Sequence, residues 1–106
     1  GEVHFLPRPG EGIARAVLDG AREVVLSTRR PGLRMCVGVG RPRRSFKKLC
    51  QEADIPAWMR DRLPVLWVDG EPAWIGGIGL GADFTCPASH AGLVPQWRKW
   101  QGRSEA

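Results

Sequence analysis

The stretch VLWVDGEPAWI, residues 65–75, decides the fold expected of this chain. Its first four residues, Val65 to Val68, form a continuous apolar run, which is typical of a strand covered on both faces. Asp69-Gly70 is a strong signal for a tight turn between antiparallel strands. The chain then returns through Ala73-Trp74-Ile75. The sequence therefore predicts a buried β-hairpin, with both of its tryptophans in the core.

Weaker strand signals flank this hairpin on both sides. Pro72 is expected just ahead of the return strand, where its missing N–H does least harm. The glycine-rich run that follows is expected to form a kinked strand. The further strands expected are Val3–Leu6, Glu23–Thr28, Arg34–Val39, Gly76–Gly81 and Gln96–Trp100, before a polar tail over residues 101–106.

The clearest helix signal is Phe46–Ala53. Phe46, Leu49, Cys50 and Ala53 recur at the spacing of one helical face, and Ser45 suits the N-cap position. Shorter helices are expected at Pro56–Arg62, which Pro64 ends, and, from weak periodicity, at Gly12–Leu18. Helices packed on antiparallel strands make the expected fold class α+β.

Length and composition point to a single domain. The chain has 106 residues, which suits one domain over residues 1–106. It does not begin with methionine, so we expect it to be a piece of a larger protein. The longest uncharged apolar stretch, residues 73–82, is too short to span a membrane. Three cysteines without paired spacing favour a reducing compartment, and we expect a cytoplasmic, soluble protein.

The positive charge is concentrated in one segment, which we call the basic window, Arg29–Lys48. It carries eight cations and no acid, whereas the rest of the chain has eight cations and eleven acids. The net charge of +5 is therefore the sum of +8 and −3. The cations of the window are Arg29, Arg30, Arg34, Arg41, Arg43, Arg44, Lys47 and Lys48.

Two interpretations of the basic window stay open. Its cations could form a solvated face that pairs with Glu52, Asp54 or Asp61. The alternative is phosphate recognition, which the excess of arginine over lysine, six to two, favours because guanidinium groups make forked contacts with phosphate oxygens. Four of the cations lie at the start of the expected helix, where its backbone amides and dipole would join them around an anion.

Other chemistry is poorly supported by the sequence. Gly77-x-Gly79-x-x-Ala82 resembles a dinucleotide fingerprint, but no helix is expected to follow it. Cys86 and His90 have half of a zinc-site spacing and lack convincing further ligands. No nucleophile with a placed base is evident, so we expect no catalytic site, cofactor or metal in this chain. Among the five tryptophans, Trp58, Trp97 and Trp100 are candidates for stacking on nucleic-acid bases.

Three motifs in this order resemble the C-terminal domain of tRNA(Ile)-lysidine synthetase. They are RRPGLR at residues 29–34, RRSFKKL at residues 43–49 and IPAWMRDRLPVL at residues 55–66. The hairpin residues Val68–Glu71 and the Gly77-Ile78-Gly79 run are also similar to the family, and the resemblance covers about residues 24–84.

The resemblance implies a fold similar to a domain of the phenylalanyl-tRNA synthetase β chain, an antiparallel β-sandwich with a helical layer. It implies a ligase that attaches lysine to the wobble cytidine of an isoleucine tRNA with a CAU anticodon. ATP and Mg²⁺ would be used by an N-terminal catalytic domain of the same protein, which this chain lacks. The tRNA would be bound by the cations of the window together with Arg60 and Arg62.

Two other functions remain open. The domain could dock another domain of its own enzyme through the basic face, or it could be a free-standing general RNA binder. Salt-dependent binding of tRNA would disfavour the first, and preference for one tRNA over bulk RNA would disfavour the second.

Overall fold

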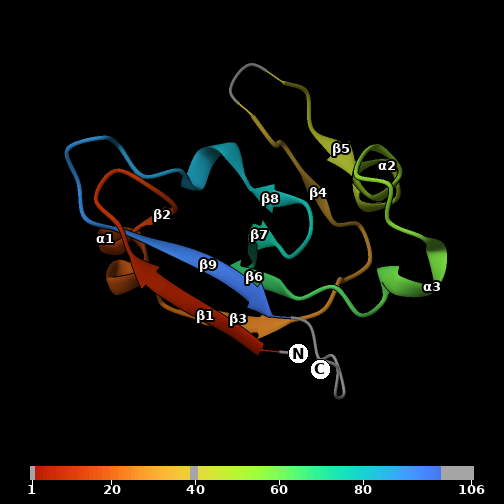
Figure 1. Cartoon of the computed structure of the whole chain (residues 1–106), viewed down its shortest axis with the longest axis horizontal. Coiled ribbons are helices and arrows are strands. Elements are labelled where there is room, and N and C mark those ends of the chain that lie inside the picture. Colours follow the sequence, from red (N-terminus) through yellow and green to blue (C-terminus); the bar gives the residue numbers. More distant parts are fainter. Residues whose placement is uncertain (1, 39–40, 99–106) are drawn as a thin grey trace, which may run out of the picture.

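The hairpin forms the middle of a four-stranded sheet. A computed structural model describes residues 2–38 and 41–98. In it β6 (Val65–Val68) and β7 (Glu71–Ile75) are antiparallel and lie between β3 (Val24–Ser27) and β8 (Gly79–Leu80), in the order β3-β6-β7-β8 (Figure 1). Asp69 and Gly70 turn the chain with positive φ angles of 50° and 82°. The predicted hairpin is confirmed.

Two details of this sheet differ from the sequence expectations. Pro72 lies inside β7 rather than before it and is the partner of Trp67, where the register between the strands shifts. Of the glycine-rich run, only Gly79–Leu80 is a strand. Residues 76–78 instead form a turn, because the Ile78 N–H donates back to the Ile75 carbonyl at 3.0 Å.

A second sheet joins the two ends of the described chain. β9 (Gly92–Arg98) lies between β1 (Glu2–Pro7) and β2 (Ile13–Ala14), and both pairings are antiparallel. The expected strand at Val3–Leu6 is confirmed. β9 begins four residues earlier than expected, and Lys99 and Trp100, at the expected end of that strand, lie outside the described residues.

The helix expected at Gly12–Leu18 is wrong in position. Ile13 and Ala14 form β2, and the helix α1 is Arg15–Gly20. Ile13 is fully buried in the sheet, whereas Val17 is 37% exposed, so the two residues do not share a helical face. The strand pairing of Ile13 with Leu93 overrides the weak local periodicity.

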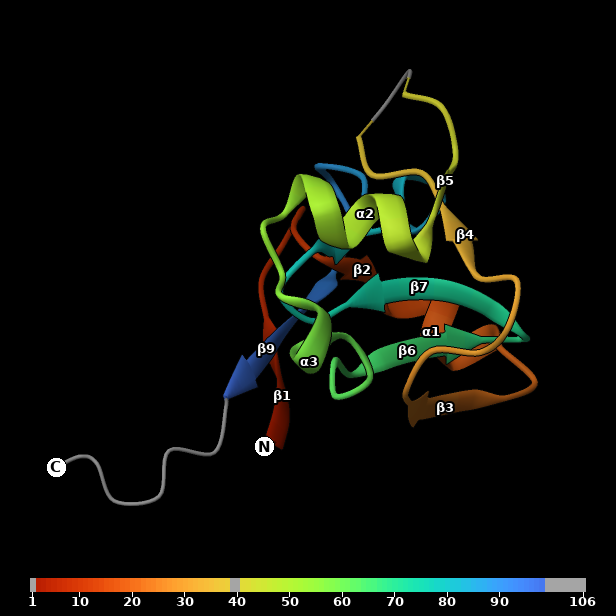
Figure 2. The same cartoon turned by 90° about the vertical axis from the view of Figure 1, so that its right-hand side faces the viewer.

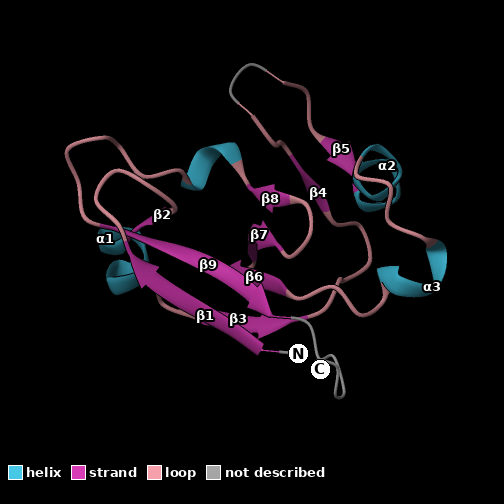
Figure 3. Cartoon of the chain, in the orientation of Figure 1, coloured by secondary structure: helices cyan, strands magenta, loops and turns pink. Residues whose placement is uncertain are grey.

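The basic window contains a third, small sheet and leads into the helices. β4 (Arg34–Met35) and β5 (Arg44–Ser45) pair antiparallel. Of the described residues in the expected strand Arg34–Val39, which are residues 34–38, only Arg34 and Met35 form a strand. α2 (Phe46–Glu52) and α3 (Ala57–Arg60) follow, and a single 3₁₀ turn (Ala82–Phe84) comes after β8 (Figure 3).

The predicted phase of α2 is confirmed. Phe46, Leu49 and Cys50 are buried, whereas Ala53 is exposed because it lies just after the last helical turn. Ser45 caps the helix, and its Oγ accepts a hydrogen bond from the Lys48 N–H at 3.2 Å. α3 is shorter than the expected Pro56–Arg62, since Pro56 is its N-cap and the chain leaves the helix at Asp61.

The core consists of two apolar clusters on opposite faces of the central sheet. Val65 and Trp67 of β6 face the cluster under α2, α3 and β4, whereas Leu66 and Val68 face the cluster shared with the β1-β9-β2 sheet. α2 and α3 therefore lie on one side of β6 and β7, and the β1-β9-β2 sheet lies on the other (Figure 2). The α+β fold with antiparallel sheets is confirmed. Over residues 2–38 and 41–98 we find no helix of the length and apolar character that a membrane span needs.

Candidate nucleic-acid interface

The β4–β5 pairing folds the basic window back on itself. Arg34 lies opposite Ser45, and Met35 lies opposite Arg44. The Phe46 N–H donates to the Leu33 carbonyl at 3.2 Å, which ties the start of α2 to the turn that follows β3. Cations from the two ends of the window therefore come together, although Arg34 and Lys47 are 13 positions apart in the sequence.

A groove lies between these two ends. Its volume is about 490 Å³, and its walls are the segment 29–34 and the first residues of α2. Four cations line it, from both halves of the window. The lining residues are Arg29, Arg30, Pro31, Gly32, Leu33, Arg34, Ser45, Phe46 and Lys47.

Aromatic rings hold two of the groove arginines in place. The Arg29 guanidinium lies 5.1 Å from the centroid of the Phe46 ring, and the Arg30 guanidinium lies 4.4 Å from that of Trp67. Both rings belong to buried residues, and the Trp67 Nε1–H donates to the Thr28 carbonyl at 3.2 Å. Guanidinium groups that already lie over fixed rings lose less freedom when they bind a phosphate.

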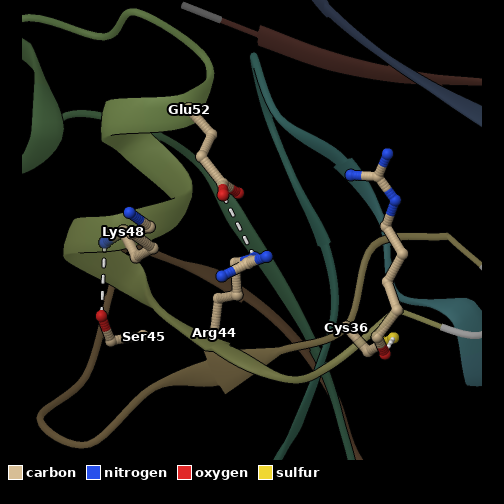
Figure 4. Close-up of polar contacts among 6 residues, drawn as sticks. Cys36, Arg44, Ser45, Lys48 and Glu52 are labelled. Carbon is tan, nitrogen blue, oxygen red and sulfur yellow. Dashed lines mark hydrogen bonds and ion pairs between the residues drawn. The ribbon is translucent and has the colours of Figure 1, made fainter.

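Three cations of the window form ion pairs. Arg29 lies 2.7 Å from Asp61, Arg44 lies 3.1 Å from Glu52 and, more loosely, Arg43 lies 3.7 Å from Glu71. Figure 4 shows the Arg44–Glu52 pair beside the Ser45 cap of α2. The interpretation as a solvated, paired face is thus correct for Glu52 and Asp61. It missed Glu71, which β7 brings to the window, and Asp54 pairs with no described cation.

The other five cations of the window are in no ion pair with the described part of the chain, and all five are exposed. Exposure of Lys47 and Lys48 confirms the prediction for α2. The pairing of Lys47 and Lys48 with Asp54 and Asp61, which would have made the basic window structural, is not found among the described residues. The five are Arg30, Arg34, Arg41, Lys47 and Lys48.

Backbone amides at the start of α2 are less available than the sequence suggested. The Phe46 N–H is donated to Leu33 and the Lys48 N–H to Ser45. The helix has only seven residues, so its dipole is short as well. Side-chain cations, rather than the end of the helix, are therefore the groups that could bind an anion here.

The remaining site residues predicted from the sequence are spread around this groove. Arg43 lines a neighbouring hollow of about 380 Å³ that also contains Arg30 and Arg34. Arg41 and Arg44 line a separate hollow of about 280 Å³ next to Leu49 and Ile78. The ten predicted residues thus do not share one cavity.

Arg60 and Arg62 lie on or just after α3. Arg60 is half-buried, and its Nε–H donates to the Ile55 carbonyl at 3.2 Å, so it braces the chain before α3. Arg62 is exposed. The Arg29–Asp61 pair links the end of α3 to the groove.

In the described part of the chain, the cysteines and histidines form no cluster of three or more groups that could hold a metal ion. The Cys86 thiol lies 3.4 Å from the His90 carbonyl oxygen, a backbone contact rather than a shared ligand set. Burial in the core raises the pKa of the Cys50 thiol, against the opposing effect of the Arg60 and Arg29 charges. Cys50 is therefore a protonated core residue at neutral pH.

Comparison with known proteins points to a single family. The family model described as "TilS substrate C-terminal domain" matches residues 24–97. Two similar relatives, both called tRNA(Ile)-lysidine synthase, come from Azoarcus sp. (strain BH72), 59% identical over 87% of this chain, and Aromatoleum aromaticum, 56% identical over 93%. A third, from Nitrosomonas europaea, is 36% identical over 95%. The chain spans 20%, 23% and 22% of these three relatives.

Proposed function

This chain belongs to the TilS substrate C-terminal domain family, and from that premise we propose that it is a non-catalytic, tRNA-binding domain of a tRNA(Ile)-lysidine synthase. The whole enzyme would attach lysine to the wobble cytidine of an isoleucine tRNA with a CAU anticodon. An N-terminal catalytic domain of the same protein would bind ATP and Mg²⁺ in the cytoplasm. The present domain would bind the tRNA body, and we expect the acceptor stem to be the part that it contacts.

The observation that carries this proposal is the cationic groove. Arg29, Arg30, Arg34 and Lys47 line it, and of these four only Arg29 is paired with an acid of the described residues. Like charges gathered in one groove repel one another, and a polyanion relieves that repulsion. A string of phosphates spaced along a nucleic-acid backbone is the anion that best matches cations spread along a groove.

The existing ion pairs do not oppose this use. The pairs at Arg29, Arg43 and Arg44 are all partly exposed to solvent, and exposed pairs of this kind contribute about 0–1 kcal/mol each. A phosphate oxygen can replace the carboxylate at little cost. The predicted cations are spread over separate hollows, so we expect four to six phosphate contacts rather than ten.

A salt titration tests the proposal. Labelled isoleucine tRNA is titrated with the 106-residue chain at several salt concentrations. Four to six contacts correspond to a slope of log K against log salt of about −3 to −5, at roughly 0.7–0.9 per contact. Binding that does not change with salt, or no binding, would overturn the proposal and favour docking to another domain of the enzyme.

A comparison of RNAs separates this domain from a general RNA binder. The same titration is repeated with methionine tRNA and with an unstructured RNA homopolymer at one fixed salt concentration. Contacts with the tRNA body require tighter binding of both tRNAs than of the homopolymer. Equal affinity for all three RNAs would show that the groove recognises phosphate alone.

A further inference from the structure

Trp58 stands apart from the other described tryptophans. It is 71% exposed, whereas Trp67 and Trp74 are buried at 4% and 6% and Trp97 packs against both core clusters. Neither apolar cluster includes Trp58. The packing of this domain therefore does not account for an indole at this position.

The backbone around Trp58 is firmly anchored. The next residue, Met59, packs against the core under α2, and Leu63 is fully buried. The Met59 N–H donates to the Pro56 carbonyl at 3.0 Å, and the Arg60 side chain donates to Ile55 at 3.2 Å. With Met59 turned inward, α3 presents Trp58 to solvent from a fixed position rather than from a loose loop.

The surroundings of Trp58 are cationic. Arg62 follows it by four residues and is exposed in the turn just after α3. The one acid of this segment, Asp61, is paired with Arg29, whose guanidinium lies over the Phe46 ring in the groove wall. α3 lies beside α2 in both Figure 1 and Figure 2. The Arg29–Asp61 pair thus links the chain three residues after Trp58 to the wall of the cationic groove.

We propose that Trp58 is a stacking platform for an unpaired nucleobase of the RNA whose phosphates lie in the groove. This inference rests on the proposed RNA binding and adds the kind of nucleotide that is recognised. An exposed indole face stacks on any base, because every base has a π-face. We expect the base to be unpaired, because a base paired inside a duplex is stacked on both faces and offers only its edges in the grooves. With the tRNA body as the proposed partner of the groove, the ligand is then a duplex that adjoins a single strand.

The test compares two RNAs and three proteins. The RNAs are a hairpin with a short single-stranded 3′ overhang and the same hairpin with a blunt end. The proteins are the wild-type chain, Trp58→Ala and Trp58→Phe, with circular dichroism to confirm that each variant is folded. Affinity is measured across salt concentrations, and quenching of tryptophan emission is recorded for each RNA.

The proposal requires the wild-type protein to bind the hairpin with the overhang more tightly than the blunt hairpin. Trp58→Ala should weaken binding of that RNA by about 5- to 150-fold, the range that stacking free energies of about 1–3 kcal/mol give. It should leave the blunt hairpin and the salt slope unchanged. Trp58→Phe should keep part of the preference, because it keeps a π-face, and should lose most of the overhang-dependent quenching.

Other results would overturn the stacking role in distinguishable ways. If Trp58→Ala binds both RNAs as the wild type does, the groove binds RNA without Trp58. If it weakens both RNAs equally, Trp58 supports the fold or the groove rather than a base. If wild-type protein binds neither RNA with salt dependence, the proposed function itself fails, and the stacking role with it.

Discussion

Removal of Lys47 and Lys48 should weaken RNA binding without weakening the fold. Both side chains are exposed at the start of α2, and neither forms an ion pair with a described residue. If both contact phosphate, the change to alanine removes two contacts and flattens the slope of log K against log salt by about 1.4–1.8. The change also removes two positive charges from the N-terminal end of a helix, which the helix dipole disfavours. The free energy of unfolding should therefore stay the same or rise by up to about 1 kcal/mol.

These slopes translate into large differences in affinity. Over a fourfold rise in salt, a slope of about −3 to −5 lowers wild-type affinity by about 60- to 1,000-fold. The double variant should lose about 7- to 12-fold less affinity over the same range of salt. Fluorescence anisotropy with labelled tRNA measures both proteins under identical conditions, and chemical denaturation measures their stability.

A matched control removes the same charge elsewhere. Arg22 and Arg98 are exposed and lie outside the basic window, so Arg22→Ala with Arg98→Ala lowers the net charge equally. That variant should keep the wild-type slope within about 0.5, because these cations make no phosphate contact in this account. Equal flattening by both double variants would refute the reasoning, since net charge rather than the groove would then govern binding.

Three further predictions follow from the core and from the lack of a catalytic site. Leu49→Ala should cost roughly 2–5 kcal/mol in the free energy of unfolding, because Leu49 is 4% exposed in the core under α2; a neutral result in urea would show that this cluster is not formed. The free energy of unfolding should fall as pH rises above about 9, because burial raises the pKa of the Cys50 thiol above its ordinary value of 9.0 and the unfolded chain then releases its proton more easily. In Cys50→Ala this alkaline fall should be smaller, and an unchanged fall would remove Cys50 as its source. The chain incubated with ATP, lysine and tRNA should yield no lysidine by mass spectrometry, and any product would contradict the non-catalytic role.

Local signals predicted the elements whose shape depends on neighbouring residues. The β6–β7 hairpin follows from an apolar run and Asp69-Gly70, and α2 follows from a cap and one apolar face. β2 was missed because its two residues form a strand only through pairing with β9, almost 80 residues away in sequence. Periodicity carries no information about such a pairing.

The candidate site was predicted in part for the same reason. Charge counting located the basic window, but it could not show that β4 and β5 fold it into a groove. The same count missed Glu71, which reaches Arg43 from β7, and it treated the amides of α2 as free although Leu33 and Ser45 accept two of them. Long-range pairings decide which cations remain available.

Chemical footprinting tests the central claim most directly, since it maps which cations RNA covers. The chain is treated with a lysine-acetylating and an arginine-modifying reagent, with and without isoleucine tRNA, and modified peptides are quantified by mass spectrometry. The account requires protection of Lys47, Arg30 and Arg34, while Arg22 and Arg98 react equally in both samples. Full reactivity of the three groove residues in the presence of bound tRNA would contradict it.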